Sequence, residues 1–168
     1  MIKGQNINSV IAIIKKKLCA ISQDIYLKKL SEFSKLNLYS SIKTKCIREP
    51  YLVQIHNVYH RKSVSQLRLS SHKLPIEAGR HEGLKRVDRI CKLCKISIGT
   101  EEHCLMECLH PALYTIRNKY FDTIFHVNKQ LCVLPRKMLF KYIMLFSDVN
   151  HTRDSAKYVF QILETILQ

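Results

Sequence analysis

The stretch CKLCKISIGTEEHCLMEC, residues 91–108, contains four of the chain's seven cysteines and one histidine. Cys91 and Cys94 form a CxxC pair, and the turn between them can bring both sulfur atoms to the same side of one ion. A closed tetrahedral zinc shell needs two more ligands, and Cys108 is a natural third. A cluster of buried, unreactive cysteines is the alternative, but CxxC followed at this distance by His and Cys favours a metal site.

The fourth ligand is either His103 or Cys104. On a regular helix Cys104 and Cys108 lie one turn apart on one face, whereas positions 103 and 108 lie about 140° apart. A regular helix therefore favours Cys104, and His103 fits if the last turn is looser. Thr100 is expected to cap this short helix, and a hairpin-like turn is expected at Cys91–Cys94.

The formal net charge of the 168-residue chain is +15, and it is concentrated in two blocks. Residues 1–50 carry 10 Lys or Arg and 3 Asp or Glu, and residues 60–95 also carry 10 and 3. Residues 96–168 carry 8 and 7, so the C-terminal part is nearly neutral. Such blocks favour a face directed toward a polyanion, and nucleic acid in particular. The alternative is that the lysines only solvate helices.

The periodicity predicts a mainly α protein. Residues 7–33 are predicted to form a long helix because their apolar residues fall mostly three or four apart: Ile7, Val10, Ile11, Ile14, Leu18, Ile21, Ile25 and Leu30. Shorter helices are expected at about 50–57, 61–71, 111–125 and 135–146, and from a cap at Asp148 or Asn150 to the end.

Side-chain directions are also predicted for two of these helices. In 61–71, Val64, Leu67 and Ser71 are expected to face inward, and Arg61, Lys62 and Arg68 outward. The core stripe of the last helix is expected to be Ala156, Val159, Phe160, Leu163 and Leu167. The segment KLPIEAGRHEGLKRVDR, residues 73–89, is predicted to be a loop, because Pro75 and Gly79 interrupt it.

Several classes of function lack their motifs. His81-Glu82-Gly83-Leu84-Lys85 has Lys where a zinc protease helix needs its second His, and no glycine-rich phosphate loop or paired aspartates are present. No small-molecule substrate is expected. The run VIAIIKKK is too short for a secretory core or a membrane span, so the cysteines are expected to be reduced. Cys19, Cys46 and Cys132 lie in apolar helical patterns and are expected to be core residues.

The stretch LRLSSHKLPIEAGRHEGLKRVDRICKLC, together with EEHCLMEC, resembles the C-terminal region of non-LTR (LINE-type) retrotransposon polyproteins. In that family this region follows the reverse transcriptase and carries a zinc-binding CCHC element. The resemblance covers about residues 36–168, and residues 1–35 resemble the connector behind the polymerase. It implies a helical, bundle-like domain over 36–168 with a small zinc-binding insertion at 91–108, behind a helical connector over 1–35.

The resemblance also implies a ligand set and a function. The family's order of ligands selects Cys91, Cys94, His103 and Cys108 for Zn²⁺. The polymerase and endonuclease are absent, so the chain is expected to be a non-enzymatic remnant or fragment, nuclear or cytoplasmic and not secreted, that grips template RNA or target DNA. The basic block at 60–95 predicts phosphate contacts at Arg68, Lys73, Arg80, Arg86, Arg89, Lys92 and Lys95, and because it has few aromatic residues, binding is expected to be sequence-tolerant. The alternative is a zinc-clipped helical module for protein interaction or structure, without nucleic-acid binding. No membrane partner is expected.

Overall fold

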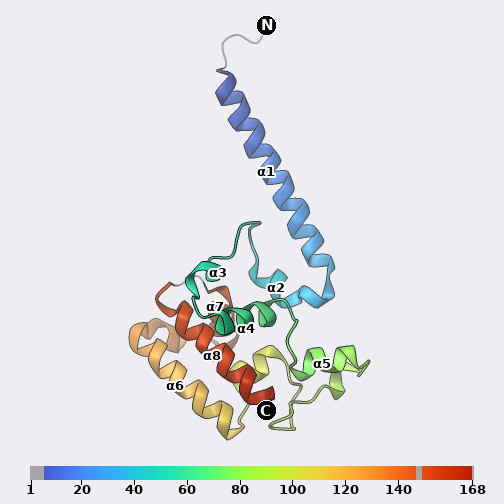
Figure 1. The fold of residues 1–168 in the computed structure, drawn as a ribbon, viewed down its shortest axis with the longest axis vertical. Coiled ribbons are helices and arrows are strands. Elements are labelled where there is room, and N and C mark those ends of the chain that lie inside the picture. The colour runs from blue at the N-terminus through green and yellow to red at the C-terminus, as the bar shows by residue number, and fades with distance from the viewer. Residues whose placement is uncertain (1–5, 147–148, 168) are drawn as a thin grey trace. The chain divides into compact units, whose positions relative to one another are not determined.

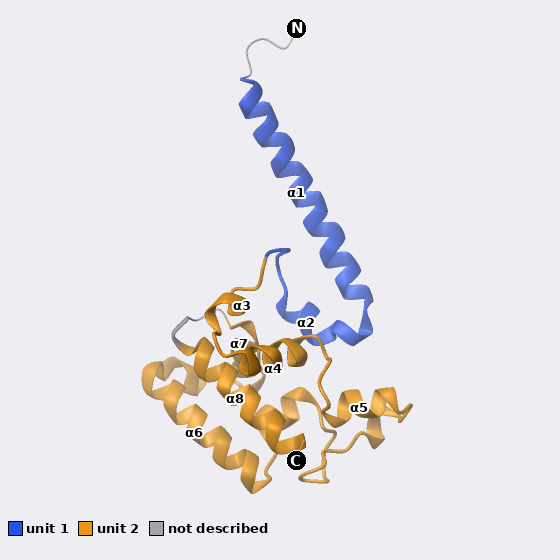
Figure 2. Cartoon of the chain, in the orientation of Figure 1, with its two compact units in different colours: residues 1–47 blue, residues 48–168 orange. Residues whose placement is uncertain are grey.

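The computed structural model describes residues 6–146 and 149–167 (Figure 1). The chain divides into two compact units, Met1–Ile47 and Arg48–Gln168 (Figure 2). Over the described residues the secondary structure is helical, apart from an isolated antiparallel bridge between Ile90 and Ile98. The mainly α fold predicted from the sequence is therefore confirmed.

The first unit is dominated by one long helix, α1 (Ile7–Glu32), as the apolar period predicts. Asn6 caps it, because its side-chain oxygen accepts a hydrogen bond from the backbone N–H of Asn8 at 3.1 Å. Phe33 then takes an extended conformation and ends the helix. The short elements η1 (Ser34–Leu36) and α2 (Asn37–Ile42) follow.

The core of the second unit forms where α8 (Val149–Leu167) packs against both α4 (Val58–Arg68) and α6 (Pro111–Val127). The rings of Tyr120 on α6 and Tyr158 on α8 stack in parallel, with centroids 4.2 Å apart. The hydroxyl groups of Tyr120 and Ser155 share a 2.7 Å hydrogen bond. These contacts fix the register of α6 against α8.

The predicted stripe of the last helix is only partly correct. Ala156, Val159 and Leu163 are buried, but Leu167 is 45 % exposed and Phe160 is only partly buried. Tyr158 and Ile162 are buried as well, because α8 packs against two helices and its buried face is wider than one stripe. Asn150 lies inside α8 and so does not cap it, and Asp148 lies outside the described residues.

The remaining elements of this unit are short. They are α3 (Tyr51–Gln54), α5 (Pro75–His81), η2 (Arg86–Asp88), the π-helical turn η3 (His103–Glu107), η4 (Lys129–Val133) and α7 (Arg136–Leu145). The helices expected at 111–125 and 135–146 are confirmed as α6 and α7. The helices expected at 50–57 and 61–71 correspond to α3 and α4. Ser71 was expected to face inward, but it lies beyond the end of α4 and is exposed.

The prediction that residues 73–89 form a loop is wrong for α5. Pro75 begins this helix, where its missing N–H costs nothing. Gly79 inside it is a packing requirement, because a Cβ there would lie 2.7 Å from Cγ of Arg89. The glycine thus allows the Arg89 side chain to cross the helix closely.

The prediction that Arg68 faces outward is also wrong. Its side chain is 2 % exposed, and Nη2 lies 2.9 Å from Oε2 of Glu49. Its guanidinium also lies over the ring of Tyr51, 4.9 Å from the centroid. Arg68 therefore joins α4 to the segment at the start of the second unit, and it cannot reach a phosphate in solution.

Replacing Arg68 with Ala is expected to reduce the free energy of unfolding by roughly 3 kcal/mol, because a mostly buried ion pair with Glu49 is broken. Urea unfolding measures the change. Lys62→Ala, an exposed position on the same helix, is the matched control and should change stability by less than about 0.5 kcal/mol. Equal losses in the two variants would contradict this role.

Candidate metal centre

Four side chains of the second unit converge on one point. One potential ligand atom from each of Cys91, Cys94, His103 and Cys108 lies within 4.8 Å of the other three. Sγ of Cys94 is 3.3 Å from Nε2 of His103, and Sγ of Cys91 is 3.9 Å from Sγ of Cys108. A tetrahedral ion with bonds of about 2.0–2.3 Å holds its ligand atoms about 3.3–3.8 Å apart. The cluster therefore has the size of a tetrahedral metal site.

A hairpin provides the first two thiols. The Ile90–Ile98 bridge and a 2.8 Å hydrogen bond from Cys91 N–H to the Ser97 carbonyl hold its two sides together. The chain turns after Cys94, where Lys95 N–H donates to the Cys91 carbonyl at 2.9 Å and Lys95 adopts a left-handed φ of 58°. The predicted hairpin-like turn is present, and it directs both sulfur atoms to one side.

A capped turn provides the other two groups. The side-chain oxygen of Thr100 accepts a hydrogen bond from the backbone N–H of His103 at 3.0 Å, as the capping prediction requires. The next turn, η3, is π-helical, and Cys108 N–H donates to the His103 carbonyl at 2.8 Å. Because a π turn bonds residues five apart, His103 and Cys108 lie on the same side of it.

The π turn bears directly on the choice between His103 and Cys104. A regular helix would place Cys104 beside Cys108, but the wider turn moves His103 into the four-residue group instead. Cys104 is fully buried next to the group. Its interaction with Cys91, together with burial, raises the pKa of the Cys104 thiol, and the same interaction lowers the pKa of Cys91. Cys104 is thereby suited to remain a neutral thiol donor, and Cys91 to be a thiolate ligand.

The π turn leaves backbone carbonyls that no helical N–H reaches, and the core satisfies them. The Leu105 carbonyl accepts a hydrogen bond from Nε of Arg117 at 2.8 Å and another from the hydroxyl of Tyr158. Arg117 lies on α6 and Tyr158 on α8, and both side chains are buried. The metal-site turn is thus fixed directly to the two helices that form the core.

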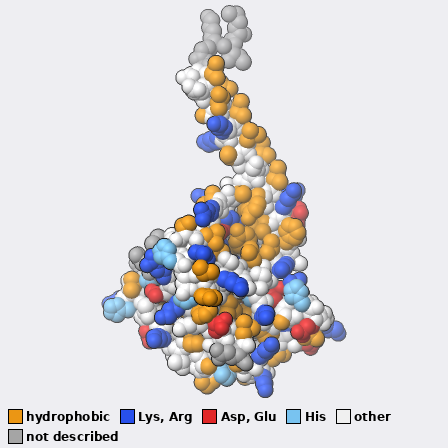
Figure 3. Space-filling view, viewed as in Figure 1, with side chains coloured by type: hydrophobic (Ala, Val, Ile, Leu, Met, Phe, Trp, Pro, Cys, Tyr) orange, Lys and Arg blue, Asp and Glu red, His pale blue; other side chains and the backbone are white. Residues whose placement is uncertain are grey.

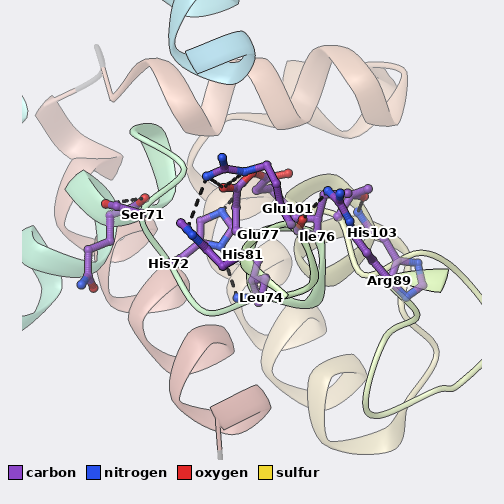
Figure 4. A network of polar contacts seen from close by, with 12 residues as sticks. Ser71, His72, Leu74, Ile76, Glu77, His81, Arg89, Glu101 and His103 are labelled. Carbon is purple, nitrogen blue, oxygen red and sulfur yellow. Dashed lines mark hydrogen bonds and ion pairs between the residues drawn. The ribbon is translucent and has the colours of Figure 1, made fainter. Parts of the chain in front are cut away.

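Polar contacts also connect the segment before α5 to the capped turn, as Figure 4 shows for His72 and Glu101. Leu74 N–H donates to Nδ1 of His72, so Nε2 carries the proton and donates to Glu101 at 3.0 Å. Burial is the largest influence on Glu101 and raises its pKa, but the interactions with His72, the backbone and Arg86 together outweigh burial, so the pKa lies below its usual value. Sequence reasoning missed this pair, because the partners are 29 residues apart and no spacing rule connects them.

Gly99 and Arg89 complete that support. A Cβ at Gly99 would lie 2.7 Å from Cγ of Pro75, so only glycine lets the hairpin pack against the start of α5. Arg89 donates to the Ile76 carbonyl at 2.9 Å and to the Leu84 carbonyl at 2.8 Å. The hairpin and α5 therefore form one supported structure.

The predicted phosphate contacts fall into two groups. Lys73, Arg86, Lys92 and Lys95 are exposed. Arg68 is buried against Glu49, Arg80 forms an ion pair with Glu77 at 2.7 Å, and Arg89 binds backbone carbonyls. Of the second group, Arg68 is excluded as a phosphate contact, and the hydrogen-bonding groups of Arg80 and Arg89 are largely committed within the protein.

The three cysteines outside residues 91–108 were expected to be core residues, and this expectation is wrong. Cys19, Cys46 and Cys132 are all exposed. Cys19 lies beside the apolar stripe of α1 and not on it, Cys46 follows α2 in an irregular segment, and Cys132 lies in the short 3₁₀ element η4. An apolar neighbourhood in the sequence therefore did not imply burial.

No protein-family model, curated protein or solved structure matches this chain. None of the described helices is long and apolar enough to cross a bilayer. The function of this chain is therefore inferred from the candidate metal centre and the side chains around it.

Cys91→Ser is expected to lower the metal content of the purified protein from about one ion per chain to nearly none, because it removes a buried ligand. Cys132→Ser is the matched control, since the same change is made at an exposed position outside the cluster. Elemental analysis after desalting measures both. Equal metal content in the two variants would refute the assignment.

His103→Ala and Cys104→Ser distinguish a ligand from its neighbour. His103→Ala should weaken metal affinity beyond the 10–100-fold typical of a lost supporting contact, and Cys104→Ser should stay within that range. Competition with a chelator measures the affinities. The absorption spectrum of the cobalt-substituted protein should indicate three thiolates in wild type and in Cys104→Ser. Four thiolates in wild type would assign Cys104 as the ligand.

Proposed function

We propose that the metal ion is zinc and that the chain is a non-enzymatic, zinc-stabilised module that binds nucleic acid. Three thiolates and one imidazole are a donor set typical of closed structural zinc sites. Thr100 accepts a hydrogen bond from the backbone N–H of the ligand His103, and Glu101, two residues before that ligand, pairs with His72. Zinc here supplies folding energy and holds the hairpin in shape.

The observation that carries the nucleic-acid proposal is the position of the exposed cations relative to the ligands. Lys92 lies between the two ligands of the CxxC pair, and Lys95 directly follows the second. Arg86 lies in η2 just before the hairpin. The ion would hold these charges on a rigid turn, so that a phosphate backbone could meet them with little loss of backbone freedom.

The resemblance to the C-terminal region of non-LTR retrotransposon polyproteins points in the same direction, toward template RNA or target DNA as the ligand. Contacts of this kind read charge and not sequence, so binding should tolerate any base composition. The alternative is a zinc-stabilised protein-interaction module whose lysines are only solvated. It predicts that the affinity for a protein partner changes little with salt concentration.

A triple variant tests the proposal: Arg86→Gln, Lys92→Gln and Lys95→Asn, the last because asparagine tolerates a left-handed backbone. With single-stranded RNA, log affinity should fall by about 0.7 per phosphate contact for each tenfold rise in salt. Loss of three contacts should therefore flatten the slope by about 2, with zinc still bound. Fluorescence anisotropy over a salt series gives the slope.

The matched control removes the same net charge elsewhere in the second unit. Lys129→Gln, Lys137→Gln and Lys141→Gln replace three exposed lysines outside the hairpin. This variant should keep the wild-type slope. If both triple variants bind as wild type does at every salt concentration, the hairpin cations are only a solvated surface and the interaction module becomes the better explanation.

A further inference from the structure

The long helix α1 exposes a continuous apolar stripe. Six isoleucine or leucine side chains along it are between 44 % and 76 % exposed: Ile7, Ile11, Ile14, Leu18, Ile21 and Ile25. Apolar side chains run along the length of this helix in the space-filling view (Figure 3). A stripe of this size on one helix is typical of a surface that is covered by another helix.

The spacing of the stripe defines the kind of partner. Successive members are alternately four and three residues apart, from residue 7 to residue 25. This alternation is the a/d pattern of a left-handed coiled coil, with Ile11, Leu18 and Ile25 at a and Ile7, Ile14 and Ile21 at d. We propose that α1 is a coiled-coil helix through which copies of this chain associate with one another as a parallel trimer.

The residue types at a and d select the number of chains. Leucine at d favours two-stranded coils, but every d position here is isoleucine. Isoleucine at both a and d shifts the preference from two strands to three or four, and Leu18 is the only departure from isoleucine at these positions. The packing rule therefore favours a trimer over a dimer.

The charges beside the stripe select the direction. In a parallel coil each g position faces the e position five residues later in the neighbouring chain, which pairs Asp24 with Lys29 and Lys17 with Ser22. In an antiparallel coil with the two stripes fully overlapped, Lys15 would face Lys15 and Lys17 would face Lys17. Parallel chains therefore gain an opposite-charge pair, and antiparallel chains would place two like-charge pairs at the centre.

The proposal is tested on the whole chain with adjacent, matched substitutions. Ile14 lies on the stripe and is 51 % exposed, and Ile13 lies off the stripe and is 50 % exposed. Sedimentation equilibrium of the wild type should give a trimer of about 59 kDa, three times the 19.7 kDa chain. Ile14→Lys should raise the concentration needed for association at least 100-fold, and Ile13→Lys should leave it within a fewfold of wild type.

Two results would overturn self-association. One is a wild-type chain that stays monomeric at every concentration, in which case the stripe belongs to a different polypeptide. The other is equal dissociation by Ile13→Lys and Ile14→Lys, in which case the stripe is not the contact. Circular dichroism and metal content confirm that each variant is folded.

Cross-linking tests the direction. Ile7→Cys and Ile21→Cys are introduced separately into metal-loaded protein carrying Cys19→Ser, Cys46→Ser and Cys132→Ser, which removes the exposed thiols. A parallel, in-register coil brings each new thiol against its own copy, so mild oxidation should link chains in both variants. The overlapped antiparallel coil places residue 7 beside 25 and residue 21 beside 11, so the absence of links in both would overturn the parallel arrangement. This proposal does not depend on metal or nucleic-acid binding.

Discussion

The hydrogen bonds to the Leu105 carbonyl connect the candidate metal centre to the core. The π turn brings His103 and Cys108 to one side, and it also leaves this buried carbonyl without a helical partner. Arg117 from α6 and the Tyr158 hydroxyl from α8 satisfy it. An unpaired buried carbonyl would cost about 1–3 kcal/mol, so a donor from either helix stabilises the turn, and in the folded protein both helices provide one. The geometry of the ligands and the packing of the core are therefore coupled.

Two glycines and the side chain of Arg89 connect the hairpin to α5. Gly79 and Gly99 permit approaches that any Cβ would block. Arg89 uses the space at Gly79 to reach two backbone carbonyls. Arg89 belongs to the basic block at 60–95, but its guanidinium is bound within the protein. The net charge of the block therefore overstates the number of cations that are available to a ligand.

The sequence predicted the features that depend on local periodicity and spacing. The apolar period located α1 closely, the helices expected from start signals at 111–125 and 135–146 agree with α6 and α7 to within two residues, and the cysteine spacing located the hairpin. It failed where a contact between distant residues is decisive. Gly79, predicted to interrupt the chain, lies inside α5, where the missing Cβ leaves room for Arg89. Arg68, predicted to face outward, is buried in an ion pair with Glu49, 19 residues away. The choice between His103 and Cys104 depended on a π turn, which helical geometry alone does not predict.

The separations of these contacts along the chain imply an order of assembly. The thiols of Cys91 and Cys108 are 17 residues apart and the Arg117–Leu105 hydrogen bond spans 12, whereas the contact of Arg153 with Gln54 spans 99. Short loops close with less loss of entropy and sooner than long ones. We therefore expect the ion to enter a local intermediate of hairpin, π turn and α6, onto which α8 docks later. Refolding should then be faster when the metal is present from the start than when it is added after the chain has collapsed; equal rates would place ion capture after the docking of α8.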